Sequence, residues 1–250
     1  MYFSVLTLFP EFINAFFATG MIARGIEKQL ISGSVINIRD YAFDKHHTVD
    51  DKPYGGGSGM VMKPEPLKAA VIDAKKACSG AKVLLMTPQG VPFNQNMAAE
   101  MSVQKQGLIF VCGRYEGIDE RFYATWVDGE VSIGDYVMTG GEIAAMAMID
   151  AVARLIPGVL GSPRSPQSDS FVKGRLEYAH YTRPEKFQGL KVPKTLLSGN
   201  HGKIRQWRKN SALQRTLLKR PDLFNTLALT KAEKKILKSW CQELKALVGS

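Results

Sequence analysis

The segment Gly107–Arg121 reads GLIFVCGRYEGIDER, an unbroken apolar run that passes directly into a glycine-rich turn. A short apolar run bounded by turn residues is typical of a strand that is buried on both faces of a parallel sheet. The run Lys82–Thr87 (KVLLMT) has the same character. The two segments therefore predict an α/β domain built on a mostly parallel sheet.

The pattern around these two runs extends the prediction over residues 1–160. Strand-like and helix-like stretches alternate there, as they do in α/β domains whose helices flank the sheet. The further expected strands are Tyr2–Phe9 and Ser34–Arg39. The expected helices are one that starts at Pro10, followed by Met21–Leu30, Lys63–Ala77 and Gly141–Ile156.

The composition changes after residue 160. Gly161–Asp169 reads GSPRSPQSD, with two prolines and no apolar residue, which is typical of a linker. We therefore expect a flexible linker over residues 161–173 and a small helical domain over residues 174–250. Its expected elements are two short basic helices, His201–Asn210 and Ser211–Arg220, and a final helix that begins with a capping box of Thr230 and Glu233.

The charge is divided along the same boundary. Residues 1–160 carry 14 Lys and Arg against 17 Asp and Glu, whereas residues 161–250 carry 19 against 6. The net charges are therefore −3 and +13, which together give the +10 of the whole chain. This asymmetry predicts a C-terminal part that binds nucleic acid. The alternative is a solvated basic surface without a partner.

Composition excludes several other classes of protein. The chain has 250 residues, of which 45% are hydrophobic and 22% charged, as in ordinary globular proteins. No stretch approaches the roughly 18 apolar residues that a membrane-spanning helix needs. The three cysteines are scattered and form no CxxC pair, which argues against a disulfide framework and against a zinc site. The first residues lack the features of a signal peptide, so we expect a cytoplasmic protein without a membrane partner.

Four segments are richer in glycine than packing requires. They are Pro53–Met60 (PYGGGSGM), Gly113–Arg121 (GRYEGIDER), Ser132–Glu142 (SIGDYVMTGGE) and Ser198–His201 (SGNH). Glycine lets the backbone approach a ligand closely, and ligands of open α/β sheets bind outside the carboxyl ends of the strands. The alternative is a set of ordinary tight turns. None of the segments fits a P-loop or a Rossmann fingerprint, so a nucleoside triphosphate or dinucleotide site is not indicated.

The glycine-rich segments belong to a longer series of motifs. In chain order these are PYGGGSGM, VCGRYEGIDER, SIGDYVMTGGE, ARLIPGVLG, DSF followed by HYTRP, and LLSGNH. The series, from Leu8 to about Leu229, resembles the bacterial tRNA (guanine-N1)-methyltransferase family, which belongs to the SPOUT class of S-adenosylmethionine-dependent enzymes. The resemblance implies a trefoil-knotted parallel sheet, a homodimer and a tRNA substrate. It also implies methyl transfer from S-adenosylmethionine to N1 of the guanosine immediately 3′ of the anticodon (position 37), a modification that supports reading-frame maintenance.

The resemblance assigns two catalytic residues. Guanine N1 carries a proton at neutral pH, so its methylation calls for a general base, and a cation is needed where charge grows on O6. Asp169 matches the family's base and Arg154 its cation. From the residues alone, capping of a following helix is the favoured role of Asp169, and Arg154 suits the end of a helix through the dipole. Direct methyl transfer needs no covalent nucleophile, so Cys112 is interpreted as a core residue.

The resemblance places S-adenosylmethionine in three loops. We expect backbone hydrogen bonds to adenine and ribose and apolar walls around them. The expected binding residues are Met86, Pro88, Gln89, Gly90, Gly113, Arg114, Tyr115, Glu116, Ile133, Gly134, Asp135, Tyr136, Val137, Met138, Gly140 and Gly141. The family's activity also depends on Mg2+, but no cluster of metal ligands is legible in the sequence.

The resemblance further implies that tRNA lies across both subunits, on the knot domain of one and the C-terminal domain of the other. The expected contacts are His46, Asp50, Gly57, Gly59, Ser170, His180, Arg183, His201, Lys203, Arg205, Arg208 and Lys209. Trp207 lies among these basic residues, where it can stack on a base or anchor the core.

Three positions depart from the family pattern. His47 replaces an arginine, Ser58 a proline and Ala144 a proline. Two other interpretations remain open from the sequence: a non-catalytic RNA-binding module with a vacant cofactor site, and another SPOUT enzyme acting on a ribose 2′-hydroxyl or on ribosomal RNA.

Overall fold

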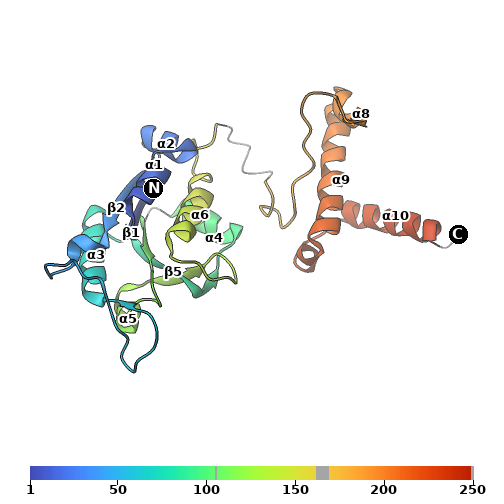
Figure 1. The fold of residues 1–250 in the computed structure, drawn as a ribbon. Helices are drawn as coiled ribbons and strands as arrows, with labels where there is room; N and C mark the ends of the chain where they lie inside the picture. Colours follow the sequence, from blue (N-terminus) through green and yellow to red (C-terminus); the bar gives the residue numbers. More distant parts are fainter. Residues whose placement is uncertain (105, 162–168, 249–250) are drawn as a thin grey trace. The chain divides into compact units, whose positions relative to one another are not determined.

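The computed structural model describes residues 1–104, 106–161 and 169–248. The chain divides into two compact units, Met1–Pro163 and Arg164–Ser250 (Figure 1). Of the expected linker over residues 161–173, the positions 162–168 lie outside the described residues.

The first unit is built on a five-stranded sheet whose strands all pair in parallel, which confirms the predicted sheet type. The spatial order is β2-β1-β6-β5-β7. The strands are β1 (Tyr2–Thr7), β2 (Ser32–Asn37), β5 (Lys82–Pro92), β6 (Leu108–Cys112) and β7 (Gly129–Ser132). The two apolar runs that predicted the fold, β5 and β6, lie next to each other in the middle of this sheet.

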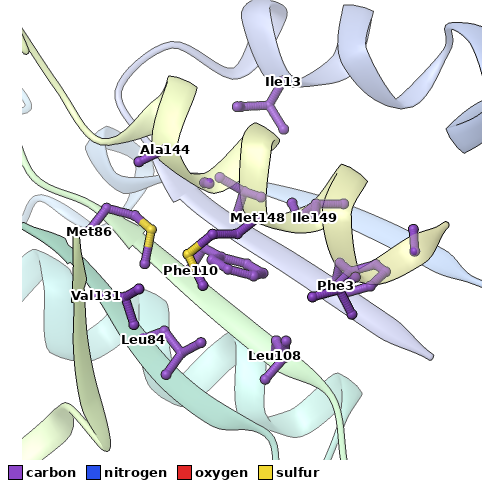
Figure 2. Close-up of a cluster of buried hydrophobic side chains, with 14 of the residues drawn as sticks. Phe3, Ile13, Leu84, Met86, Leu108, Phe110, Val131, Ala144, Met148 and Ile149 are labelled. Carbon is purple, nitrogen blue, oxygen red and sulfur yellow. The ribbon is translucent and has the colours of Figure 1, made fainter. Parts of the chain in front are cut away.

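Helices cover both faces of the sheet, and each face has its own core. Alternate residues of β6 point to opposite faces, so Phe110 joins one buried cluster and Ile109 the other. The first core contains residues of α1 (Pro10–Phe17), α2 (Gly20–Glu27), α4 (Gln95–Val103) and α6 (Glu142–Ala153). The second contains residues of the 3-10 turn η1 (Ile38–Tyr41), α3 (Pro64–Ala77) and α5 (Glu120–Trp126). Figure 2 shows the first core, in which Met148 and Ile149 of α6 lie over Phe110 and Phe3 of the sheet.

Local sequence explains where the helices begin. Proline occupies the first turn of α1 and α3, where its missing N–H costs no hydrogen bond. The Asn94 side chain caps α4 by accepting hydrogen bonds from the backbone N–H groups of Asn96 and Met97. Asp119 caps α5 in the same way through Arg121 N.

The described part of the second unit contains helices and a small hairpin. Its elements are β8 (Lys186–Phe187), β9 (Leu190–Lys191), α8 (Lys194–Leu197), α9 (His201–Lys219), the 3-10 turn η2 (Pro221–Asn225) and α10 (Lys231–Val248). The prediction of two basic helices over 201–220 is wrong, because α9 runs without a break through Asn210 and Ser211. Neither residue breaks a helix. The Asn210 side chain accepts a hydrogen bond from Gln206 Nε2, and the Ser211 hydroxyl accepts one from Ala179 N.

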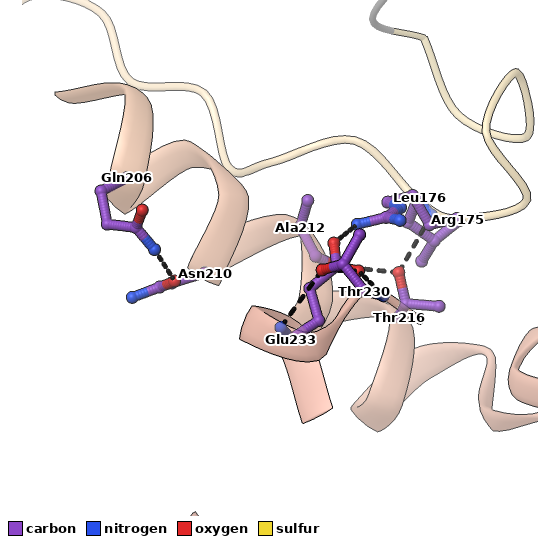
Figure 3. A network of polar contacts seen from close by, with 8 residues as sticks. All are labelled: Arg175, Leu176, Gln206, Asn210, Ala212, Thr216, Thr230 and Glu233. Atoms are coloured by element: carbon purple, nitrogen blue, oxygen red, sulfur yellow. Dashed lines mark hydrogen bonds and ion pairs between the residues drawn. The ribbon is translucent and has the colours of Figure 1, made fainter. Parts of the chain in front are cut away.

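The predicted capping box is confirmed at the start of α10. Glu233 N donates to Thr230 Oγ1 at 3.3 Å, and Thr230 N donates to Glu233 Oε2 at 2.9 Å. Arg175, from the segment before α8, forms an ion pair with the same carboxylate (Figure 3). Burial alone would raise the pKa of Glu233, but the hydrogen bonds from Arg175 and Thr230 outweigh it and lower the pKa to about 2.

The depressed pKa of Glu233 predicts an acid-sensitive contribution to stability. A carboxyl that titrates lower in the folded than in the unfolded chain stabilises the fold above its ordinary pKa of about 4.5, and this contribution is lost as the pH falls towards 2. Glu233→Gln should therefore lower the free energy of unfolding at pH 6, and its difference from wild type should shrink towards pH 3. Urea unfolding at both pH values measures this.

Glu243→Gln is the matched control, since it removes an exposed carboxylate from the same helix. It should change the free energy of unfolding little at either pH. The prediction would be contradicted if Glu233→Gln lowered the free energy of unfolding by the same amount at pH 6 and at pH 3.

Candidate active site

A cavity of about 270 Å³ opens at the carboxyl ends of the central strands of the first unit. Its walls come from β5, from the loop that follows β6 and from the loop that follows β7. This is the place where open parallel sheets bind ligands.

The structure gathers the expected cofactor residues around this cavity, with two exceptions. The expected residues that line it are Met86, Pro88, Gln89, Gly113, Arg114, Tyr115, Glu116, Ile133, Gly134, Tyr136, Val137, Met138, Gly140 and Gly141. Gly90 and Asp135 are not among the lining residues. The structure gives Gly90 another role, because a Cβ there would lie 2.3 Å from Val131 N of β7. Glycine at this position thus lets β5 and β7 approach each other.

Sequence reasoning missed other residues of the wall. They are Leu85, Thr87, Gly117, Ile118, Tyr123, Val131, Ser132, Thr139 and Ala144. Most of them adjoin an expected residue in the chain, so wider loop boundaries would have included them. Tyr123 comes from α5, which the sequence did not predict, and no motif pointed to it. Burial, with Glu130 and Glu120 nearby, raises the pKa of the Tyr123 phenol, so it is a neutral group in the wall.

A bulge in β5 shapes one side of the cavity. Met86 and Val91 both pair with Val131 of β7, so the residues between them bend out of the ladder. These residues include the Pro88-Gln89-Gly90 segment. Bulges commonly turn side chains and backbone towards a site in this way.

Two adjacent glycines bring the start of α6 against the sheet. A Cβ at Gly141 would lie 2.8 Å from Met86 Cβ and 2.9 Å from Cys112 Cα, and Gly141 N donates to Gly113 O at 3.0 Å. A Cβ at Gly140 would lie 2.1 Å from Arg114 Nε. Only glycine leaves room for this approach, so the GG pair of the SIGDYVMTGGE segment has a steric reason.

A partly buried ion pair fixes the same junction. Arg114 reaches Glu142 Oε2 with Nη2 at 2.9 Å and Nε at 3.1 Å, and its Nη1 donates to Thr139 O at 3.1 Å. Glu142 is 1% exposed and accepts a further hydrogen bond from Thr7 Oγ1 at 2.7 Å. The Arg114 guanidinium also stacks 4.3 Å from the centroid of the Phe9 ring. These contacts join the ends of β1 and β6 to the first turn of α6, where a carboxylate suits the helix dipole.

The glycine-rich loop over residues 53–60 adjoins the cavity through Glu116. A short hairpin of β3 (Asp50–Asp51) and β4 (Val61–Met62) carries this loop. Glu116 N donates to Met60 O at 3.0 Å, and a Cβ at Gly59 would lie 2.5 Å from Glu116 Cγ. Gly57 belongs to the same loop and Asp50 to its first strand, while the exposed His46 precedes the hairpin. The expected tRNA contacts of the first unit therefore share one loop system.

The departures from the family pattern fall on this unit. His47 has a φ of +51° and its Nδ1 lies 3.1 Å from Arg39 O, while Ser58 is an exposed residue of the glycine-rich loop. Ala144 is buried in the wall of the cavity, where its small side chain is accommodated.

The two expected catalytic residues belong to different units. Arg154 is half-buried and directly follows α6 as its C-terminal cap, with its N–H donating to Asp150 O at 3.1 Å. A cation at this position suits the helix dipole. Asp169 is the first described residue of the second unit. Residues 170–173 form turns, so capping of a helix there by Asp169 is not supported. Ser170 accepts a hydrogen bond from Glu177 N at 3.1 Å.

Cys112 is fully buried in the first core, as interpreted from the sequence. Burial raises the pKa of its thiol well above the ordinary value, and the nearby Glu142 carboxylate adds to the effect. The thiol is therefore protonated at neutral pH and unsuited to act as a nucleophile.

The expected tRNA contacts of the second unit lie on α9 and on the segment before α8. His201, Lys203, Arg205, Arg208 and Lys209 are exposed on the first half of α9. The Arg208 guanidinium lies 4.8 Å from the Tyr178 ring centroid, and the His180 ring lies 4.6 Å from the same ring. His180 Nε2 is 3.2 Å from Glu177 Oε2, and Arg183 follows two residues after the exposed Tyr181.

Among the residues that the structure describes, no group of three or more His, Cys, Asp or Glu side chains is placed to hold a metal ion. In the same part of the chain, no helix is both long and apolar enough to cross a membrane.

The fold and the site together define a parallel α/β protein with a glycine-lined cavity at its strand ends and a second, basic helical unit. Comparison with known proteins identifies the family. The family model for tRNA (Guanine-1)-methyltransferase TrmD matches residues 1–226. The chain therefore belongs to the tRNA (guanine-N1)-methyltransferase family, as the resemblance predicted.

Curated relatives agree over nearly the whole chain. The tRNA (guanine-N(1)-)-methyltransferase of Geobacter sp. (strain M21) is 52% identical over 236 residues, which cover 94% of each chain. The protein of the same name from Haemophilus influenzae is 52% identical over 239 residues, covering 95% of this chain and 97% of the relative. The one from Pelotomaculum thermopropionicum is 49% identical over 249 residues, 99% of each chain.

The Arg114–Glu142 pair should show strong energetic coupling. Arg114→Ala leaves the buried Glu142 carboxylate without its cation, so this variant should destabilise the fold nearly as much as the double variant with Glu142→Ala does. We expect a coupling energy on the order of 1–3 kcal/mol from urea unfolding of the four proteins. The exposed pair Lys76–Asp73 on α3 is the control, with an expected coupling of about 0.5 kcal/mol or less. Additive losses at Arg114 and Glu142 would contradict the prediction.

Proposed function

We propose that the chain transfers a methyl group from S-adenosylmethionine to N1 of the guanosine immediately 3′ of the anticodon, position 37, in tRNA. Family membership supports guanine-N1 methylation of tRNA. The observation that carries the finer proposal is the convergence of the expected cofactor residues, all but Gly90 and Asp135, on one cavity at the strand ends. Methylation at this position would support reading-frame maintenance.

The chemistry of the cavity fits S-adenosylmethionine. Met86, Ile133 and Met138 supply apolar wall for an adenine ring, and the glycine-rich loops supply backbone N–H and C=O groups. Tyr136 and Val137 line the cavity yet remain 54% and 86% exposed, so a bound ligand would cover apolar surface. When bound, this cofactor supplies an electrophilic methyl group on a sulfonium.

Two side chains would then act on the guanine. Asp169 would accept the N1 proton, which makes N1 nucleophilic, and Arg154 would stabilise the negative charge that develops on O6. Since the two residues belong to different units, the reaction would require both units to reach the same guanosine.

The remaining parts of the proposal concern the RNA and the assembly. The exposed cations of α9 would contact phosphates, and His46, Asp50 and the glycine-rich loop would contact the anticodon region. We propose that the two sets come from different subunits of a homodimer and that the first unit carries the trefoil knot of the SPOUT class. We propose that any Mg2+ requirement is met without a dedicated protein site.

Asp169→Asn should separate catalysis from binding. The amide cannot take the N1 proton, so we expect methyl transfer to tRNA to fall by about 10²- to 10⁴-fold. Binding of S-adenosylmethionine, measured by calorimetry, should stay unchanged. Hydroxide in solution can take the N1 proton when the general base is missing. The residual rate of methyl transfer by the variant should therefore rise more steeply with pH than the rate of wild type.

Asp222→Asn is the matched control, since it removes an exposed carboxylate of the same unit. It should retain wild-type turnover. Full turnover by Asp169→Asn would remove Asp169 as the base, whereas loss of cofactor binding would show that the variant disturbs the cavity instead.

A further inference from the structure

The second unit has a cavity of its own that the proposed chemistry leaves unused. Its volume is about 320 Å³, and it is lined by α9 and by the segment Ala179–Tyr181. The α9 side of the wall includes Trp207, Asn210, Gln214 and Leu218, which follow one another at helical spacing and so share one face. The buried residues of α9, by contrast, are Ala212, Leu213 and Thr216. The cavity is therefore distinct from the packed interior of the unit.

Hydrogen bonds hold the covering segment against the helix. Ala179 N donates to Ser211 Oγ at 3.0 Å, and Leu176 N donates to Thr216 Oγ1 at 3.0 Å. Leu176 and Thr216 are visible in Figure 3. Because the segment is fixed at both points, Tyr181 stands beside Trp207, with ring centroids 6.1 Å apart at 62°. Tyr181 is 51% exposed and Trp207 is half-buried, so the two rings form an aromatic wall open to a ligand.

The polar side of the cavity is cationic. Arg215 Nε is buried, and the described residues offer it no hydrogen-bond acceptor. Arg215 also lines the cavity, where its guanidinium supplies positive charge and further N–H donors. Lys219 lies on the same wall, and no Asp or Glu is among the described residues that line the cavity. The cavity therefore favours an anionic ligand.

Amide groups complete the wall. Gln206 Nε2 donates to Asn210 Oδ1 at 2.9 Å (Figure 3), which fixes the orientation of the Asn210 amide and leaves its nitrogen to donate to a ligand. Gln214 adds a second amide from the same face. Side-chain amides of this kind pair with the donor and acceptor edges of nucleobases.

We propose that this cavity binds one unpaired nucleotide of the substrate tRNA. The base would stack on the wall of Trp207 and Tyr181, and the phosphate would lie near Arg215 and Lys219. Aromatic rings, amides and cations around one cavity are the groups by which proteins hold single-stranded RNA, and this unit carries the excess positive charge of the chain. The proposal rests on the proposed function in taking tRNA as the substrate.

The first test is Trp207→Ala in the full chain, with the affinity for a tRNA transcript measured by filter binding. Loss of a stacked base should weaken binding by about 5- to 100-fold, with S-adenosylmethionine affinity unchanged. Trp207→Phe should restore most of the affinity. Trp240→Ala, a half-buried tryptophan of α10 outside the cavity, is the matched control and should bind as wild type does.

The second test identifies the base. Semi-synthetic tRNAs that each lack one base at an unpaired position are bound to wild type and to Trp207→Ala. Removal of one particular base should weaken tRNA binding by wild type but cause no further weakening in Trp207→Ala. If the removal of every base weakens binding equally in wild type and in Trp207→Ala, the proposal is overturned, since no base would then depend on Trp207. If circular dichroism shows that Trp207→Ala misfolds, Arg215→Met enters the same comparison with the same criteria.

The binding readout separates this proposal from the proposed function. One outcome is that removal of one base weakens binding only when Trp207 is present, while wild type transfers no methyl group to tRNA. This outcome would retain the nucleotide cavity and overturn the proposed reaction. Normal methyl transfer by wild type with no effect of Trp207→Ala on tRNA affinity would overturn the nucleotide cavity alone.

Discussion

The close approach of α6 to the central strands is the constraint on which the rest of the first unit depends. Gly141 has no side chain, so the start of α6 can lie against Met86 and Cys112, and Gly140 leaves room for the Arg114 side chain. The ion pair between Arg114 and the buried Glu142 carboxylate then fixes this position. The loop after β6 begins at this junction and the loop after β7 ends at it, and these two loops line the cavity together with the bulge of β5.

The two units divide the properties that the proposed reaction needs. The first is nearly neutral and offers a preformed cavity with apolar walls and backbone hydrogen-bonding groups, which suits a small organic cofactor. The second concentrates the positive charge on α9 and α10 and carries an aromatic cavity, which suits RNA. With Arg154 on the first unit and Asp169 on the second, the proposed chemistry would depend on RNA engaging both, and this would restrict methyl transfer to the correct substrate.

The sequence predicted the elements whose signals are local. β5 and β6 are central strands buried on both faces, so their apolar runs were legible, and proline and the Thr230–Glu233 box marked helix starts. The four-residue β7 was not predicted, because it is short and carries Glu130. The extension of β5 to Pro92 depends on the contact of Gly90 with Val131, which no local pattern reveals. The same contact explains why Gly90, expected to bind cofactor, packs between strands. Tyr123 and Trp207 line their cavities because of tertiary contacts, which the spacing of residues in the sequence does not reveal.

The most direct test of the account is methyl transfer from labelled S-adenosylmethionine to two tRNA transcripts. They differ only in carrying guanosine or adenosine immediately 3′ of the anticodon. We expect label in the guanosine transcript alone, with the methyl group on N1. Label in both transcripts would contradict the assignment of the target nucleotide. Label in neither, with the cofactor bound, would contradict the proposed reaction itself.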